Sequence, residues 1–261
     1  MTGAGGRTGA GGRTGAGGSS VTTGAGGSSV TTGAGGSSVN CSGTVPAGGT
    51  PHSSTNTSGN AAGLNWSIWT NGTAGIITTY NTPAFSASWN NSGDFLARMG
   101  LEWGNASGKT YDQFGTITAQ FAETKSGTAG GFSYVGIYGW SVNPCIEYYI
   151  IEDSYNRMPV NPGTTTNKGT VTIDGSPYTL YTRPTTGTGG SRCGASVASW
   201  TQFYSVRQTA RQCGQISITE HFKAWAAAGM TLGSMLEAKI LIEVGGGVGS
   251  IDFTTATVTA Q

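Results

Sequence analysis

The sequence predicts a mostly β protein, a β-jelly roll or sandwich of two curved antiparallel sheets with a single α-helix. Three observations lead to this fold class. Short segments of alternating apolar and polar residues recur about every ten residues, with Gly, Asn and Ser between them. Only 10% of the 261 residues are charged and 46 are Gly, which is typical of a turn-rich β protein. Seven Trp, ten Tyr and eight Phe supply aromatic surface for a core.

The chain divides into two unequal parts. Residues 1–39 repeat the segment TGAGG five times and contain no aromatic residue and no acid, so they cannot bury enough apolar surface to fold. We interpret them as a flexible Gly/Thr/Ser linker that follows another module, or a signal peptide, in a longer protein. A β-solenoid is the alternative, but each repeat offers at most one Val to its core. Residues 40–261 contain all seven Trp and form the folded domain.

The strands follow from alternation and from turn signals. In the segment 84–90, Phe85, Ala87 and Trp89 share one face, and the turn cluster 90–93 leads into a returning strand at 95–99, which makes a hairpin. The other expected strands are 75–80, 116–121, 132–140, 146–152, 169–173, 178–182, 199–208, 239–244 and 250–258.

One segment, 219–229, has the period of a helix. Thr219 is a suitable N-cap and a glycine ends the segment. Phe222, Trp225 and Ala226 fall at i, i+3 and i+4, a stripe that would pack on a sheet.

Composition and motifs exclude several classes of function. A net charge of +1 gives no electrostatic case for binding nucleic acid or an acidic membrane. No run of 18 apolar residues could span a bilayer, and the first residues lack the basic and apolar regions of a signal peptide. The only histidines are His52 and His221, without CxxC spacing, so we expect no metal site and no cofactor.

The twelve acidic residues are informative because they are few. Glu147 and Glu243 each lie inside an apolar strand, where a carboxylate is costly to desolvate unless it is paired or used. Period 2 places Glu147 on one face with Tyr149. An edge-strand glutamate that points at water is the structural alternative for either residue. Two carboxylates in an aromatic cleft are what glycosidic cleavage needs.

Several segments form a recognisable series along residues 64–258. They are Tyr138-Gly139-Trp140, Asn143-Pro144-Cys145-Ile146-Glu147-Tyr148-Tyr149-Ile150-Ile151-Glu152, the strand from Gly169 to Gly175, Thr201 to Gln208, and the helix with His221, Phe222 and Trp225. In this order the segments resemble glycoside hydrolase family 11 endo-β-1,4-xylanases. The resemblance implies a β-jelly roll with one helix and a retaining double displacement on xylan.

In this resemblance Glu147 matches the nucleophile and Glu243 the general acid/base. Asp94 matches the residue that touches the acid/base, and we expect an acidic pH optimum because Asp94 would share a proton with Glu243. Arg183 matches the arginine that supports the nucleophile. Glu237 is the nearby competitor for the acid/base role, but it lies in a stretch that looks like a loop.

The remaining site residues are matched in the same way. Tyr138 and Tyr149 match tyrosines that hydrogen-bond the nucleophile and the sugar, and Gln202 matches the glutamine that orients the substrate. Trp69 matches a tryptophan that stacks on a xylose ring. Trp140 would offer another flat face to sugar, with the sandwich core as the alternative.

Three positions depart from the family pattern. Val244 replaces Gly after the acid/base, and Cys145 stands where Leu is usual. The thumb segment 184–199 is rich in Gly, Thr and Ser and lacks the usual Pro-Ser-Ile. The last departure affects subsite contacts more than it affects the chemistry.

The four cysteines suit a secreted protein with two disulfides, for which three pairings exist. We expect Cys41–Cys213 with Cys145–Cys193, because Cys41 begins the folded region and its pairing with Cys213 would fasten an N-terminal extension onto the sandwich, as in some gut-microbe relatives. Free buried thiols are the alternative.

We therefore expect a secreted, monomeric part of a modular protein that acts on xylan and xylo-oligosaccharides. A non-catalytic binding module or lectin is the main rival, and the presence of Glu147 and Glu243 together with Arg183 and Tyr138 argues against it. An endoglucanase from a related jelly-roll family is the second rival, and the Pro-x-x-Glu-Tyr-Tyr run favours xylan.

Overall fold

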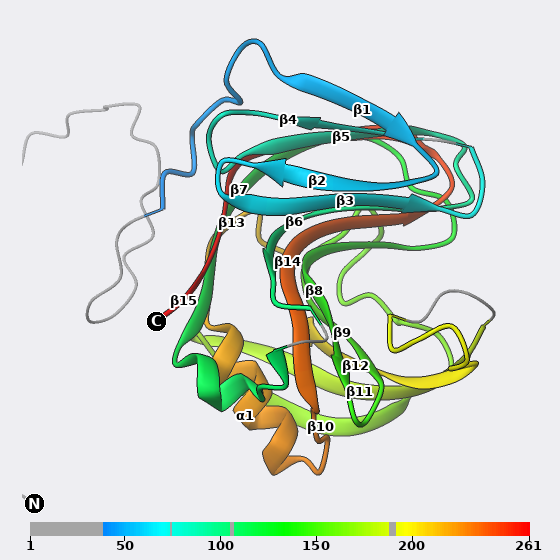
Figure 1. The fold of residues 1–261 in the computed structure, drawn as a ribbon, viewed down its shortest axis with the longest axis vertical. Coiled ribbons are helices and arrows are strands. Elements are labelled where there is room, and N and C mark those ends of the chain that lie inside the picture. Colours follow the sequence, from blue (N-terminus) through cyan, green and yellow to red (C-terminus); the bar gives the residue numbers. More distant parts are fainter. Residues whose placement is uncertain (1–38, 74, 105–106, 188–191) are drawn as a thin grey trace, which may run out of the picture.

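The computed structural model describes residues 39–73, 75–104, 107–187 and 192–261 of the chain, so the predicted linker lies outside the described residues except for its last one. The described residues form two curved sheets and one α-helix (Figure 1). The six-stranded sheet has the order β1 (Thr50–Ser54), β4 (Gly75–Thr79), β5 (Phe85–Asn90), β15 (Val248–Ala260), β7 (Ile117–Gly127) and β13 (Cys213–Ile216). The nine-stranded sheet has the order β10 (Thr166–Ile173), β11 (Ser176–Thr186), β12 (Ser199–Arg207), β9 (Ile146–Asp153), β8 (Ser133–Val142), β14 (Ser234–Gly245), β6 (Asp94–Glu102), β3 (Leu64–Thr70) and β2 (Asn56–Ala61).

The predicted fold class is confirmed, with additions. Strands β1, β2, β3 and β13 were not among those expected. Strands β1 and β2 consist mainly of Ser, Thr, Asn and Gly, and each lies at the edge of a sheet with largely exposed side chains, so no apolar alternation marks them. One pair also departs from the antiparallel expectation, because β9 and β12 run parallel with Glu147 opposite Gln202.

The alternation of side chains divides the nine-stranded sheet into two buried faces. On β9, Tyr148 and Ile150 point into the core between the sheets, whereas Tyr149 and Ile151 belong to a second cluster on the other face. Every residue of β9 is buried. Because the sheet curves, this second face is concave, and its floor is made of aromatic and aliphatic side chains.

Helix α1 (Ile218–Ala227) begins two residues earlier than the predicted N-cap, Thr219, implied. The N-cap position is Ser217, and the Thr219 hydroxyl instead accepts a hydrogen bond from the backbone N–H of Ile117 at 2.7 Å. Phe222 and Trp225 are buried against the sheet core as expected. Ala226 is exposed, so the predicted stripe is wrong there, and Ile218 takes part in the buried face instead. Among the described residues, no helix is long and apolar enough to cross a membrane.

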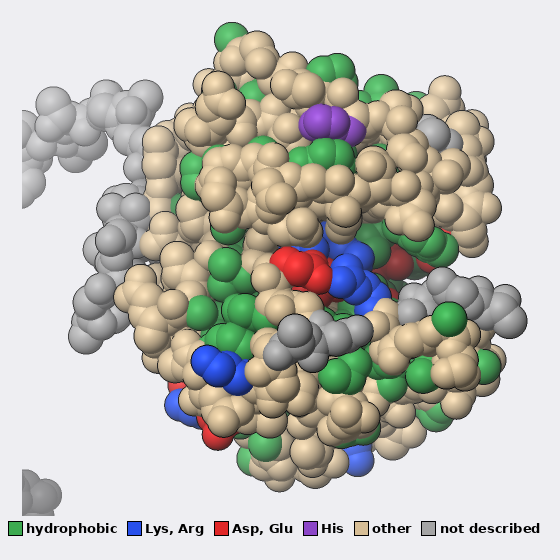
Figure 2. All heavy atoms as spheres, in the orientation of Figure 1, with side chains coloured by type: hydrophobic (Ala, Val, Ile, Leu, Met, Phe, Trp, Pro, Cys, Tyr) green, Lys and Arg blue, Asp and Glu red, His purple; other side chains and the backbone are tan. Residues whose placement is uncertain are grey.

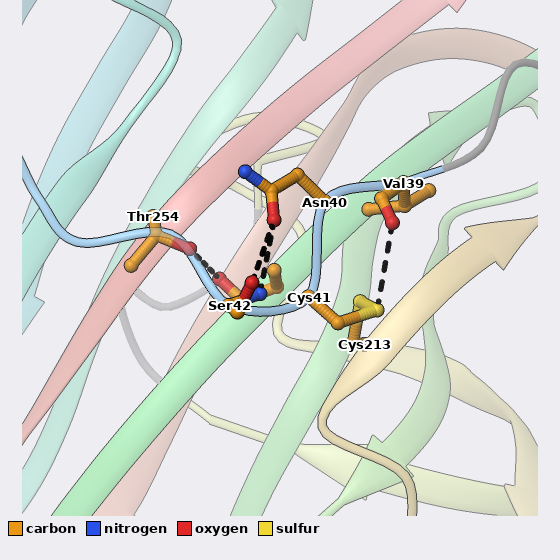
Figure 3. The surroundings of a disulfide bond; sticks show 7 residues. Val39, Asn40, Cys41, Ser42, Cys213 and Thr254 are labelled. Carbon is orange, nitrogen blue, oxygen red and sulfur yellow. Dashed lines mark hydrogen bonds between the residues drawn. A yellow bond between two sulfur atoms is a disulfide. The ribbon is translucent and has the colours of Figure 1, made fainter. Parts of the chain in front are cut away.

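Both expected disulfides are present. Cys41–Cys213 ties the segment before β1 to β13, at the edge of the six-stranded sheet (Figure 3). Cys145–Cys193 joins the residue before β9 to the segment between β11 and β12. The cysteines in the described residues are all oxidised, so the alternative of free thiols is wrong.

Candidate active site

Two buried glutamates lie on the concave face of the nine-stranded sheet. Glu147 is on β9 and Glu243 is on β14, with β8 between these strands, and the side chains of both residues are 7% exposed. Alternation explains their common face, since Tyr148 and Ile242 beside them point into the sandwich core. The sequence therefore places both carboxyl groups toward the groove rather than between the sheets.

The Glu147 carboxylate accepts four hydrogen bonds. Its Oε1 atom accepts from the hydroxyl groups of Tyr138 at 2.8 Å and Tyr149 at 3.0 Å. Its Oε2 atom accepts from the indole Nε1 of Trp200 at 2.8 Å and from the amide Nε2 of Gln202 at 2.7 Å. An ionised carboxylate only accepts hydrogen bonds, so four donors suit its charged form and fix its direction.

The donors are themselves held in place. The Gln202 Oε1 atom accepts from the Tyr204 hydroxyl at 2.8 Å and from the Thr185 hydroxyl at 2.9 Å, which orients the amide so that its NH₂ group faces Glu147. The Tyr138 hydroxyl accepts from Nε1 of Trp140 at 2.5 Å, so its own proton points to Glu147.

Glu243 has a different environment. Burial is the largest cause that raises its pKa well above the usual value, and the negative charges of Asp94 and Glu147 raise it further. A hydrogen bond joins Glu243 to Asp94, and the pKa of Asp94 is raised to about 6, first by burial and also by the charge of Glu147. Glu243 is thus the carboxyl group that keeps a proton, as a general acid must.

One tyrosine lies near both glutamates. Tyr149 donates to Glu147 Oε1, and the same residue is near enough to Glu243 to oppose the rise of its pKa. A sugar bound beside Tyr149 would therefore meet both carboxyl groups.

The other predicted site residues differ in exposure and in the groups that they contact. Trp69 is partly exposed on β3 and packs on the concave-face cluster, so part of its side chain is accessible from the groove. Trp140 lies on the concave face but is only 1% exposed; it donates to Tyr138 and packs beside Trp200, so it is neither in the sandwich core nor open to a sugar ring. Arg183 lies opposite Gln202 on β11 and donates to the backbone oxygen of Pro162 at 3.1 Å. Its support of Glu147 stays a prediction.

Glu237 is not in a loop, contrary to the sequence analysis. It is a fully buried residue of β14 that pairs with Lys239 at 2.8 Å and with Arg98 at 3.6 Å. These cations lower its pKa to about 2 in spite of burial, the largest single influence, so it cannot carry a proton as an acid would. Glu237 is therefore no competitor for the role of Glu243.

Trp200 is the residue that sequence reasoning missed. It lies on β12 two positions before Gln202, so alternation puts both side chains on the concave face. That spacing was the available signal. The two histidines are elsewhere, His52 stacked on Trp66 and His221 in α1. No group of three or more His, Cys, Asp or Glu that could hold a metal occurs in the part of the chain that the structure describes.

The site opens into a hollow on the surface. A depression of about 660 Å³ is bounded by Asn71, Asp94, Phe132 and Gly245, at the end of the groove next to Glu243. Figure 2 shows the molecule hollowed between its two lobes, with acidic and basic side chains gathered inside the hollow. A polymer chain could therefore enter the groove from the side of Asp94.

Comparisons with known proteins agree with this geometry. The family model of Glycosyl hydrolases family 11 matches residues 61–254. The chain is 43% identical to an endo-1,4-beta-xylanase of Neocallimastix patriciarum, with 74% of this chain and 57% of the relative covered. It is 40% identical to endo-1,4-beta-xylanase C of Fibrobacter succinogenes, with 74% of this chain and 31% of the relative covered. The chain thus spans between about a third and just over half of the length of these relatives.

Solved structures show the same architecture. The wild-type ENZbleach xylanase has a TM-score of 0.73 and 35% identity, over 83% of this chain and 88% of that one. The six- and nine-stranded sheets with one helix therefore make the β-jelly roll that the sequence predicts.

Proposed function

The chain belongs to glycosyl hydrolase family 11, and we propose that its folded domain hydrolyses internal β-1,4-xylosidic linkages of xylan with retention of configuration. Relatives at 43% and 40% identity are named endo-1,4-beta-xylanases, which supports the substrate class. The observation that carries the mechanism is the pair of carboxyl groups in different states. Glu147 accepts hydrogen bonds from four donors, whereas the pKa of Glu243 is raised well above its usual value, first by burial and then by the charges of Asp94 and Glu147.

In the first step an oxygen of Glu147 attacks the anomeric carbon while the glycosidic C–O bond breaks. The proton of Glu243 passes to the leaving oxygen, which departs as a hydroxyl group. In the second step water attacks the same carbon, gives its proton to Glu243 and releases Glu147 as a carboxylate. Retaining enzymes hold the two carboxyl groups about 5–5.5 Å apart, and the influence of the Glu147 charge on the pKa of Glu243 supports such closeness here.

The surrounding residues have separate tasks in this mechanism. Trp200, Gln202 and Tyr138 fix the nucleophile by hydrogen bonds. Trp69 offers an aromatic face for a sugar ring. Arg183 adds positive charge on the β11 side of the groove, where it opposes part of the rise in the Tyr134 pKa that burial and the charge of Glu243 cause.

The test is reducing-sugar release from xylan and from carboxymethylcellulose by the wild type, by Glu147→Gln and by Glu220→Gln. We expect release from xylan alone, its loss in Glu147→Gln, and normal rates in Glu220→Gln, which changes an exposed glutamate of α1. Release from carboxymethylcellulose would favour the endoglucanase alternative. Binding to xylan without release by the wild type would mean a binding module.

We also propose that the domain is secreted and monomeric as one part of a modular protein. Two disulfides in the described domain support an oxidising compartment. Another relative, 34% identical, is named a bifunctional acetylxylan esterase/xylanase, which supports the modular arrangement. In this proposal residues 1–39 serve as the linker.

A further inference from the structure

The concave face carries a group of charged residues that the proposed mechanism does not use. We define the groove ion cluster as Arg98, Glu102, Arg192, Glu237 and Lys239. Lys239 Nζ lies 2.8 Å from Glu237 Oε2 and 2.6 Å from Glu102 Oε2. Arg192 Nη1 lies 3.3 Å from Glu237 Oε2, and Arg192 Nη2 also pairs with Glu102. Removing these charges from water costs free energy, so their presence in the proposed sugar-binding groove suggests that they have a function.

Arg192 reaches this cluster from the opposite side of the groove. It belongs to the segment between β11 and β12, whereas Glu102 ends β6. In the sheet, strands β9, β8 and β14 lie between β12 and β6. Cys193 already lies beside β8 and β9, because it is bound to Cys145 and its Sγ is 3.4 Å from the backbone oxygen of Ser141, and the guanidinium group of Arg192 extends from there to Glu237 on β14 and Glu102 on β6. The disulfide therefore anchors the residue next to Arg192.

The exposure of the groove floor changes along the groove. Trp140, Glu237 and Lys239 are at most 1% exposed, although they lie on the concave face. The Arg192 side chain above them keeps 34% of its surface exposed. At the other end lies the open hollow beside Asp94. Glu243 and Glu237 are six residues apart on β14, about 20 Å measured along the strand at about 3.3 Å per residue, and the strand bends between them (Figure 1). The groove is thus open at one end and covered at the other.

The positions of the two glutamates give the groove a direction. In the strand register, Glu147 on β9 is opposite Trp140 on β8, and Trp140 is opposite Glu237 on β14. The backbone of the nucleophile therefore lies in the same row across the sheet as Glu237, at the covered end. Glu243 contacts Asp94 at the open end. The acid lies beside the leaving oxygen, so the leaving part of the polymer points to the open end. The sugars that stay on the nucleophile extend toward Arg192.

We propose that Arg192 closes the non-reducing side of the groove and limits how many sugar residues can bind there before the cleaved bond. The proposal rests on the proposed xylanase function and adds a specificity-determining residue to it. The enzyme then cuts bonds far from the non-reducing end only when the bound xylan chain displaces Arg192.

The experiment uses xylohexaose labelled at its reducing end, and measures the lengths of labelled products at early times. The wild type should cut mainly near the non-reducing end and leave long labelled products. In Arg192→Ala, cuts farther from that end should rise about fivefold relative to the others, as expected for the loss of a partly exposed ion pair. Glu102→Gln, which removes a partner of Arg192, should shift the pattern in the same direction.

Arg157→Ala is the matched control, because Arg157 is an exposed arginine outside the cluster. Identical patterns in the wild type, Arg192→Ala and Glu102→Gln would overturn the proposal while the xylanase function stands. If the wild type cuts neither xylan nor xylohexaose, the proposed function itself fails. Should Arg192→Ala fail to fold, Glu102→Gln alone decides, since its side chain keeps its size.

Discussion

The hydrogen bond between Asp94 and Glu243 predicts how activity depends on pH. When Asp94 is ionised, the proton of Glu243 is held toward it and away from the leaving oxygen. When Asp94 is neutral, the proton of Glu243 is free to move to the leaving group. We therefore expect the activity of the wild type to fall as the pH rises through the pKa of Asp94, about 6.

The magnitude follows from this pKa. A group with a pKa near 6 is about 10% ionised at pH 5 and about 90% ionised at pH 7. The activity of the wild type at pH 7 should therefore be roughly a tenth of its plateau, which corresponds to about 1.4 kcal/mol. In Asp94→Asn this titration is absent, so the decline should move upward to the pH range in which Glu243 itself loses its proton.

The assay is the pH profile of kcat/KM on xylan for the wild type, Asp94→Asn and Asp112→Asn. Asp112 is an exposed aspartate, so its variant should follow the wild type. Removal of Asp94 also removes one charge that raises the pKa of Glu243, but burial and the charge of Glu147 remain. A profile of Asp94→Asn that coincides with that of the wild type would refute the reasoning.

Two further changes test the site and the fold. Trp200→Phe removes one hydrogen-bond donor to the Glu147 carboxylate. A hydrogen bond to a charged group contributes about 1.5–3 kcal/mol, so kcat/KM should fall about 10- to 100-fold. Trp103→Phe is the control, because Trp103 stacks on Phe114 and makes no contact with Glu147, so kcat/KM should stay unchanged. Burial, then contact with Asp153, raises the pKa of Glu123 from 4.5 to about 9, so its stabilising contribution is complete below pH 4.5 and is lost as the pH rises through 9. Between pH 5 and pH 9 the Tm of Glu123→Gln should therefore fall roughly 5 °C less than that of the wild type, and parallel Tm curves would contradict this.

Much of the fold could be predicted because alternation is local. The pattern of Phe85, Ala87 and Trp89 is visible in the sequence, and these side chains are buried in the core. Strands β1 and β2 carry no such pattern, since edge strands of polar residues gain their order from the strand beside them. The helix was found by its period, but its start was set by contacts of Ser217 and Thr219 with distant residues.

Within the site, the sequence by itself determined which face Glu147 and Tyr149 share, because the period of a strand is two residues. Only the tertiary structure decided that Glu243 lies near Asp94 and Glu147, that Trp200 donates to the nucleophile, and that Arg192 pairs with Glu102 and Glu237. These contacts join different strands, so they depend on strand order and register. The packing of the whole sandwich fixes that order and register, and no short stretch of sequence contains it.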